Sequence, residues 1–235
     1  AFHEGIQDLL KNPSNYLQIK QITEQYADGY YNVIFQYDVF FKAFIKKPIF
    51  SFPHAVPYDE WKHTFTKPQR ERSGIMIATR SLNNAFLCRN TFVTIATLCE
   101  DFIGNKITYV NEDGEQGEQF LKQFKFYGLN IIPGPLSYEN WLELISQHEL
   151  VAHFDQSSNL GQVAVDAALV DVITVGSTTG NAITLLNASF ELDPFLNDVE
   201  AALQNQDHSI QLSFLKEQTS FKKMKENVVK MFEAV

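Results

Sequence analysis

Gly74-Ile75-Met76-Ile77-Ala78-Thr79 is a short apolar run that predicts a buried β-strand. It is followed by Asn90–Phe102, in which apolar residues recur at the spacing of an amphipathic helix. The same alternation continues to about residue 175. Further strands are predicted at Lys106–Val110, Leu129–Ile132, Leu150–Phe154 and Val172–Val175, and helices at about Glu115–Phe126, after an N-cap at Ser137, and at Leu160–Ala168.

Strands that alternate with helices at this spacing form a mostly parallel sheet with helices on both faces. We therefore predict an α/β fold of the Rossmann-like kind over residues 67–235. In such sheets, ligands bind beyond the carboxyl ends of the strands, where the strand order reverses.

The first third of the chain has a different pattern. It predicts one or two helices within Phe2–Gln25, interrupted at Asn12-Pro13, and short strands in Ala27–Phe35 and Lys47–Phe50. This segment is too small to bury a core of its own. We expect residues 1–66 to be the end of an N-terminal domain, with a linker over Pro57–Arg72.

Composition narrows the class of protein. The formal net charge of the 235 residues is −9, which disfavours long stretches of nucleic acid as partners. The two cysteines, Cys88 and Cys99, fit buried thiols of a cytoplasmic protein better than a disulfide framework. The sequence shows no metal-ligand spacing and no transmembrane run. Because the chain starts without Met, we expect it to begin inside a longer protein.

One segment is moderately specific. Ser158-Asn159-Leu160-Gly161-Gln162-Val163-Ala164-Val165-Asp166-Ala167-Ala168 is followed by the apolar pair Val172-Ile173 and the loop Gly176-Ser177-Thr178-Thr179-Gly180. This order resembles the donor motif Glu-x7-Glu of GT-B-type glycosyltransferases, and the preceding segments resemble the end of their N-terminal domain and their C-terminal lobe. Ser158 and Asp166 stand where that family has its two glutamates. Arg80 matches a family arginine, but the lysine that usually accompanies it is missing, and Arg89 is a candidate substitute.

The resemblance implies a nucleotide-sugar donor. Asp166 would accept both ribose hydroxyls, and Arg80 would bind the diphosphate together with the amides near Gly161. Pro135 and Leu136 would contact the base. Each residue also has an ordinary structural alternative: a surface acid for Asp166, an ion-paired arginine for Arg80, and a simple turn at Pro135. The remaining predicted donor contacts are Arg89, Asn111, Ser158, Ser177, Thr178, Thr179 and Gly180, and the alternative for Asn111 is a cap of the turn at Asp113-Gly114.

We therefore expect a glycosyltransferase that moves a sugar from a nucleotide-sugar donor to a glycan or other acceptor, without a metal ion or cofactor. The family takes its catalytic base from the other domain, so a missing N-terminal domain or a partner chain is implied. Two alternatives remain open. One is a nucleotide-sugar epimerase of the same architecture, with Asp155 as its candidate acid. The other is a non-catalytic GT-B subunit that binds or scaffolds.

Overall fold

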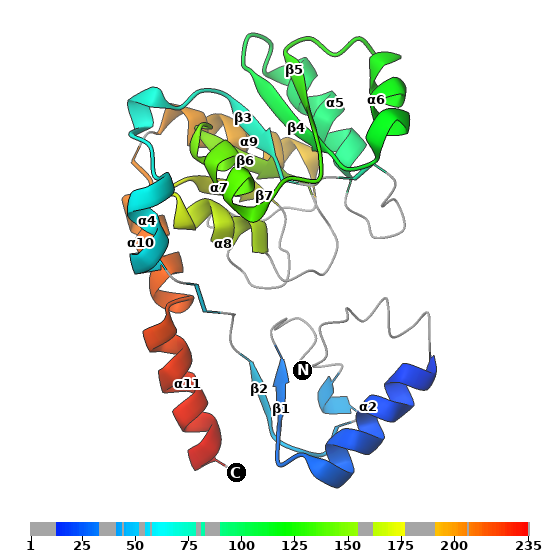
Figure 1. Ribbon diagram of the computed structural model, residues 1–235, viewed down its shortest axis with the longest axis vertical. Coiled ribbons are helices and arrows are strands. Elements are labelled where there is room, and N and C mark those ends of the chain that lie inside the picture. Colours follow the sequence, from blue (N-terminus) through cyan, green and yellow to red (C-terminus); the bar gives the residue numbers. More distant parts are fainter. Residues whose placement is uncertain are drawn as a thin grey trace.

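The structure, a computed structural model, describes residues 13–32, 41–43, 45–51, 55–56, 58–78, 81–82, 90–154, 162–176, 191–205 and 207–234. Its larger part is a layered lobe built on one sheet. A smaller part contains a helix and two short strands (Figure 1).

The larger sheet has five strands: β3 (Ile75–Ile77), β4 (Ile107–Asn111), β5 (Leu129–Pro133), β6 (Leu150–His153) and β7 (Ile173–Gly176). Their order is β5-β4-β3-β6-β7, and every neighbouring pair is parallel. Each strand lies within two residues of its predicted bounds, so the predicted α/β fold is confirmed. The order reverses between β3 and β6, because the chain moves outward from β3 to β5 and then returns to the other side of β3.

Helices cover both faces of this sheet. Successive side chains of a strand point to opposite faces, so the apolar residues of each strand are buried on both sides. Met76 and Val151 point into one apolar cluster, beneath α7 (Tyr138–Ser146) and α8 (Gln162–Leu169). Ile75 and Ile77 point into the other cluster, beneath α5 (Thr91–Asp101), α6 (Gly114–Lys122) and α9 (Leu192–Gln204). Such buried side chains each contribute about 1.5–3 kcal/mol to folding, and they fix the sheet between the two helical layers.

The segment predicted as a linker is largely helical. It contains α4 (Tyr58–Phe65) and a 3₁₀ turn at Gln69–Glu71. α4 packs on α7 and α8, and the side chain of Tyr58 is 8% exposed within the apolar cluster there. α4 thus packs on helices that lie much later in the sequence. The role of Pro57–Arg72 as a linker stays a prediction. The placement of a domain boundary near residue 66 stays a prediction.

The smaller part contains α2 (Pro13–Tyr26) and the parallel strands β1 (Tyr30–Asn32) and β2 (Ile49–Ser51). Pro13 opens α2 at a position where the missing N–H costs nothing, in line with the predicted interruption at Asn12-Pro13. The α2 side chains of Leu17, Ile22 and Tyr26 are exposed. The two parallel strands that the structure describes in this part are too few for an independent Rossmann sheet.

The C-terminal segment forms two helices. α10 (Ser209–Gln218) packs on α8, and α11 (Phe221–Glu233) continues past the sheet lobe along one side of the molecule (Figure 1). The break lies at Thr219-Ser220. Ser220 caps α11 by accepting a hydrogen bond from the backbone N–H of Lys223 at 3.1 Å.

Candidate functional site

The order reversal places the candidate site at the carboxyl ends of β3 and β6. The amino end of α5 holds the end of β6 there. The side-chain amide of Asn90 donates to the carbonyl of Phe154 at 3.1 Å, and the N–H of Phe154 donates to the hydroxyl of Thr94 at 3.2 Å. That hydroxyl in turn donates to the carbonyl of Asn90 at 3.0 Å. The backbone at the carboxyl end of β6 is therefore fixed by a closed set of bonds.

Ser81 and Leu82 are held by Asp113, which follows β4. Its carboxylate accepts from the hydroxyl of Ser81 at 2.7 Å and from the N–H of Leu82 at 2.5 Å. The hydroxyl of Thr91 donates to the carbonyl of Ser81 at 2.8 Å. Sequence reasoning did not assign Asp113 a role, although its place just after a strand is a signal for one. Arg80 directly precedes Ser81 in the sequence and lies outside the described residues.

Asn111 closes the turn after β4. Its amide donates to the carbonyl of Gly114 at 2.7 Å, and its amide oxygen accepts from the N–H of Asp113 at 3.1 Å. A Cβ at Gly117 would lie 2.5 Å from that oxygen, so the glycine makes room for the cap. The structure thus shows the capping role that was one of the two expected for Asn111, and its side chain is buried.

The turn after β5 lies beside this cap, because the N–H of Gly134 donates to the carbonyl of Asn111 at 2.9 Å. Pro135 is exposed in this turn, whereas Leu136 is half-buried against the cluster beneath α7. The structure therefore brings Asn111 and Pro135 together at the carboxyl edge of the sheet. Contact of this turn with a base stays a prediction.

Asp166 lies in α8, and its side chain is 4% exposed. One carboxylate oxygen accepts from the Tyr138 hydroxyl at 2.8 Å and from the Gln162 amide at 2.9 Å. The other accepts from the indole N–H of Trp141 at 3.0 Å. Trp141 is buried and donates this bond. The predicted ribose contact of Asp166 stays a prediction, and the structure directs the carboxylate toward α7.

The other predicted donor contacts lie outside the described residues. They are Arg80, Arg89, Ser158, Gly161, Ser177, Thr178, Thr179 and Gly180. The register pairs His153 with Gly176, so the segments that start after β6 and β7 leave the sheet from adjacent positions. Convergence of these residues on one crevice remains a prediction.

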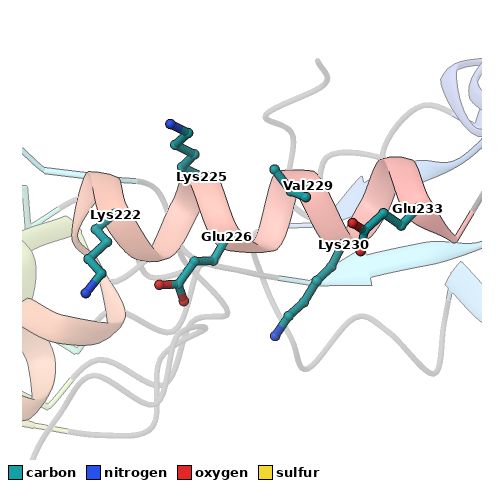
Figure 2. A pocket seen from close by; sticks show the side chains of 6 residues that line it. All are labelled: Lys222, Lys225, Glu226, Val229, Lys230 and Glu233. Carbon is teal, nitrogen blue, oxygen red and sulfur yellow. The ribbon is translucent and has the colours of Figure 1, made fainter.

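A hollow of about 370 Å³ lies along α11, away from the ends of β3 and β6 (Figure 2). Its lining residues all come from this one helix: Lys222, Lys225, Glu226, Val229, Lys230 and Glu233. The hollow combines no groups from different elements, so we do not place the candidate site there. Within the described ranges, no three His, Cys, Asp or Glu side chains gather in a way that could hold a metal ion. No helix among these residues is long and apolar enough to cross a membrane.

Comparisons with known proteins give similarity in structure and none in sequence. The sequence matches no protein-family model, and a search of curated proteins found no match. Sucrose-phosphate synthase from Thermosynechococcus elongatus superposes on the whole chain with a TM-score of 0.69 at 10% identity, and the chain covers 67% of that protein.

Two further structures are similar. The GtfA/B complex matches 94% of this chain and 48% of its own, with a TM-score of 0.68 at 10% identity. The pneumococcal O-GlcNAc transferase GtfA, in complex with UDP and GlcNAc, matches 94% of this chain and 47% of its own, with a TM-score of 0.58 at 12% identity. The fold is thus that of GT-B glycosyltransferases, and the chain spans from about half to about two thirds of the length of these proteins.

Proposed function

We propose that this chain supplies the donor-binding lobe of a glycosyltransferase that transfers a sugar from a nucleotide sugar to a glycan or another acceptor. The observation that carries the proposal is the strand order β5-β4-β3-β6-β7, which reverses between β3 and β6 in a fold shared with GT-B glycosyltransferases. In such sheets, ligands bind beyond the carboxyl ends of the strands at the point of reversal. The complex of GtfA with UDP and GlcNAc supports a nucleoside diphosphate as the leaving group.

The chemistry would depend on charge stabilisation at the diphosphate. α8 begins at Gln162, shortly after β6, so its first-turn N–H groups and the positive end of its dipole lie on the crevice side of the sheet. Arg80 would add a planar, permanently charged donor. Together these groups would stabilise the negative charge that develops on the diphosphate as the sugar leaves, without a requirement for a bound divalent ion.

The acceptor side would come from another lobe. The chain covers about half to two thirds of the similar proteins, and the part with α2, β1 and β2 is too small to form a second Rossmann sheet. We propose that a preceding domain or a partner chain supplies the acceptor site and the catalytic base. The buried, free thiol of Cys99, whose pKa is raised to about 11 by burial, fits a reducing, cytoplasmic location.

Calorimetric titration tests the donor site. UDP, GDP and ADP would be titrated into the chain, with the matching nucleosides as controls. We expect one diphosphate to bind at least about tenfold more tightly than its nucleoside, because phosphate contacts supply charged hydrogen bonds. Absence of binding by all three diphosphates would contradict the proposal. Product analysis of the chain combined with its acceptor lobe would then separate transfer from epimerisation, for which the candidate acid Asp155 lies outside the described residues.

A second candidate is a non-catalytic GT-B subunit that pairs with an active one. One observation favours it: the carboxylate of Asp166, at the position where the family has a glutamate, already accepts hydrogen bonds from Tyr138, Trp141 and Gln162. Such a subunit would form a stable complex with an active glycosyltransferase and would bind no nucleoside diphosphate itself.

A further inference from the structure

Asp166 joins the first turns of two helices. Tyr138 is the first residue of α7 and Trp141 lies one turn later, whereas Gln162 is the first residue of α8. All three donate to the one carboxylate, at 2.8, 3.0 and 2.9 Å respectively. The carboxylate thus ties the amino end of α8 to the amino end of α7.

These bonds are strong for a physical reason. An ionised carboxylate only accepts hydrogen bonds, and burial makes an unpaired charge costly. Three N–H or O–H donors satisfy most of its roughly four lone-pair positions. Bonds to an ionised acceptor are also about twice as strong as those between neutral groups.

The Tyr138 side supports the same picture. Its hydroxyl remains a donor, since burial and the nearby charge of Asp166 raise the pKa of Tyr138. The charge of Asp166 also acts on Tyr58 of α4, whose pKa is raised by burial and, to a lesser extent, by this charge. The site around the carboxylate is therefore built from three elements of the lobe, α4, α7 and α8.

The same geometry leaves little access for a ligand. With its side chain 4% exposed, Asp166 offers no open surface to a ribose diol. At the oxygen shared by Tyr138 and Gln162, a ribose hydroxyl would have to compete with both donors.

We propose that Asp166 is a positioning residue of the donor site: it sets the position of the amino end of α8 through Tyr138, Trp141 and Gln162, and it does not contact the ribose. The inference rests on the proposed donor site. α8 follows β6, so the place of its first turn determines where its N–H groups meet a phosphate.

The test compares two ligands on two proteins. The full chain and Asp166→Asn are titrated with the best-binding diphosphate of the UDP, GDP and ADP panel, and with its 2′-deoxy analogue. A positioning role predicts that Asp166→Asn weakens diphosphate binding about tenfold. It also predicts that removing the 2′-hydroxyl weakens binding by the same factor in both proteins. The substitution and the removal of the hydroxyl then act at separate places, and their effects on the binding free energy add. A weakening that vanishes in Asp166→Asn would show a direct ribose contact and overturn the proposal.

A milder variant and a control accompany this cycle. Tyr138→Phe removes one donor and keeps the ring, and it should weaken diphosphate binding in the same direction. Glu139→Gln changes an exposed carboxylate in the first turn of the same helix and should leave binding unchanged. Unchanged diphosphate binding in both Asp166→Asn and Tyr138→Phe would overturn the proposal.

A spectroscopic readout separates this inference from the proposed function. The indole N–H signal of Trp141, identified with Trp61→Phe, should shift and exchange faster with solvent in Asp166→Asn. If that change is seen but the unaltered chain binds none of the three diphosphates, the proposed function fails and the donor-site role of Asp166 fails with it. If diphosphate binds and the indole signal stays the same, the donor site stands and the positioning role is wrong.

Discussion

The phenolic oxygen of Tyr58 lies 2.5 Å from the hydroxyl oxygen of Thr219, although 161 residues separate them in the sequence. The Thr219 hydroxyl donates to the carbonyl of Leu215 at 2.8 Å, so Tyr58 is the donor of the pair. The N–H of Val56 donates to the carbonyl of Thr219 at 2.9 Å. The start of α4 and the end of α10 are thus fastened together inside the lobe.

Tyr58→Phe should lower the free energy of unfolding by about 1 kcal/mol, because it removes a buried hydrogen bond and keeps the ring. Urea unfolding at neutral pH measures the change. Tyr127→Phe, at a tyrosine that is 82% exposed, is the control and should have almost no effect. An equal effect of the two substitutions would show that the Tyr58–Thr219 bond contributes nothing.

His148 should make stability depend on pH. Its Nδ1 lies 2.8 Å from the carbonyl of Leu144 and its Nε2 lies 2.7 Å from the hydroxyl of Thr108, so the neutral ring is bonded on both sides. Burial lowers the pKa of His148 to about 4. The unfolded chain, with a pKa of about 6.5, binds the proton first as the pH falls. The stabilisation is therefore complete above about pH 6.5 and is lost between there and pH 4.

Urea unfolding at pH 7 and pH 4 checks this expectation. The free energy of unfolding should fall by up to about 3 kcal/mol more in the unaltered protein than in His148→Gln, which lacks the titrating ring. Carboxylates that titrate in the same range are common to both proteins and cancel in the comparison. Identical pH dependence in the two proteins would mean that His148 is not held neutral in the fold.

Arg72 caps the carboxyl end of α8. Its guanidinium donates to the carbonyls of Val170 at 3.0 Å, Asp171 at 2.5 Å and Lys67 at 2.8 Å, and the side chain is largely buried. Arg72→Ala should cost about 2–4 kcal/mol, since it leaves these carbonyls without their donor. Arg72→Lys should recover only a small part, because an ammonium group does not reproduce the planar fork. Arg70→Ala, at an exposed neighbour, is the control for thermal unfolding, and a loss as large as that of Arg72→Ala would argue against the cap.

Substitution of Arg80 should affect binding of the diphosphate and of the nucleoside differently. Arg80→Ala is expected to weaken binding of the nucleoside diphosphate by roughly 1–3 kcal/mol and to leave the nucleoside almost unaffected, since a guanidinium at the end of β3 would contact only phosphate. Calorimetry with both ligands measures the difference. Equal losses for the two ligands would assign Arg80 another role.

The sequence predicted the sheet well because each strand is a short, mostly apolar run, as is typical of strands covered on both faces. It did not predict α4, where charged residues lie among the apolar ones and the buried face packs on helices from later in the chain.

The candidate site was harder to predict than the fold. Asn111 could be assigned its cap from local sequence, since Asp113 and Gly114 are its near neighbours. The partners of Asp166 could not be assigned in this way. Tyr138 and Trp141 lie 28 and 25 residues before it, and only the packing of α7 on α8 brings them to its carboxylate.

The parallel bridge between Val56 and Ser220 means that the stretch holding all five strands of the larger sheet starts and ends at one place. A short linker from Ser220 to Val56 would therefore join the two ends of this stretch into a circular polypeptide. New ends can then be opened at Gly104, an exposed glycine with a φ of 100° in the turn between α5 and β4. The lobe should accept such a circular permutation with its sheet intact, because chain ends that lie side by side make the order of connection unimportant to the packed core.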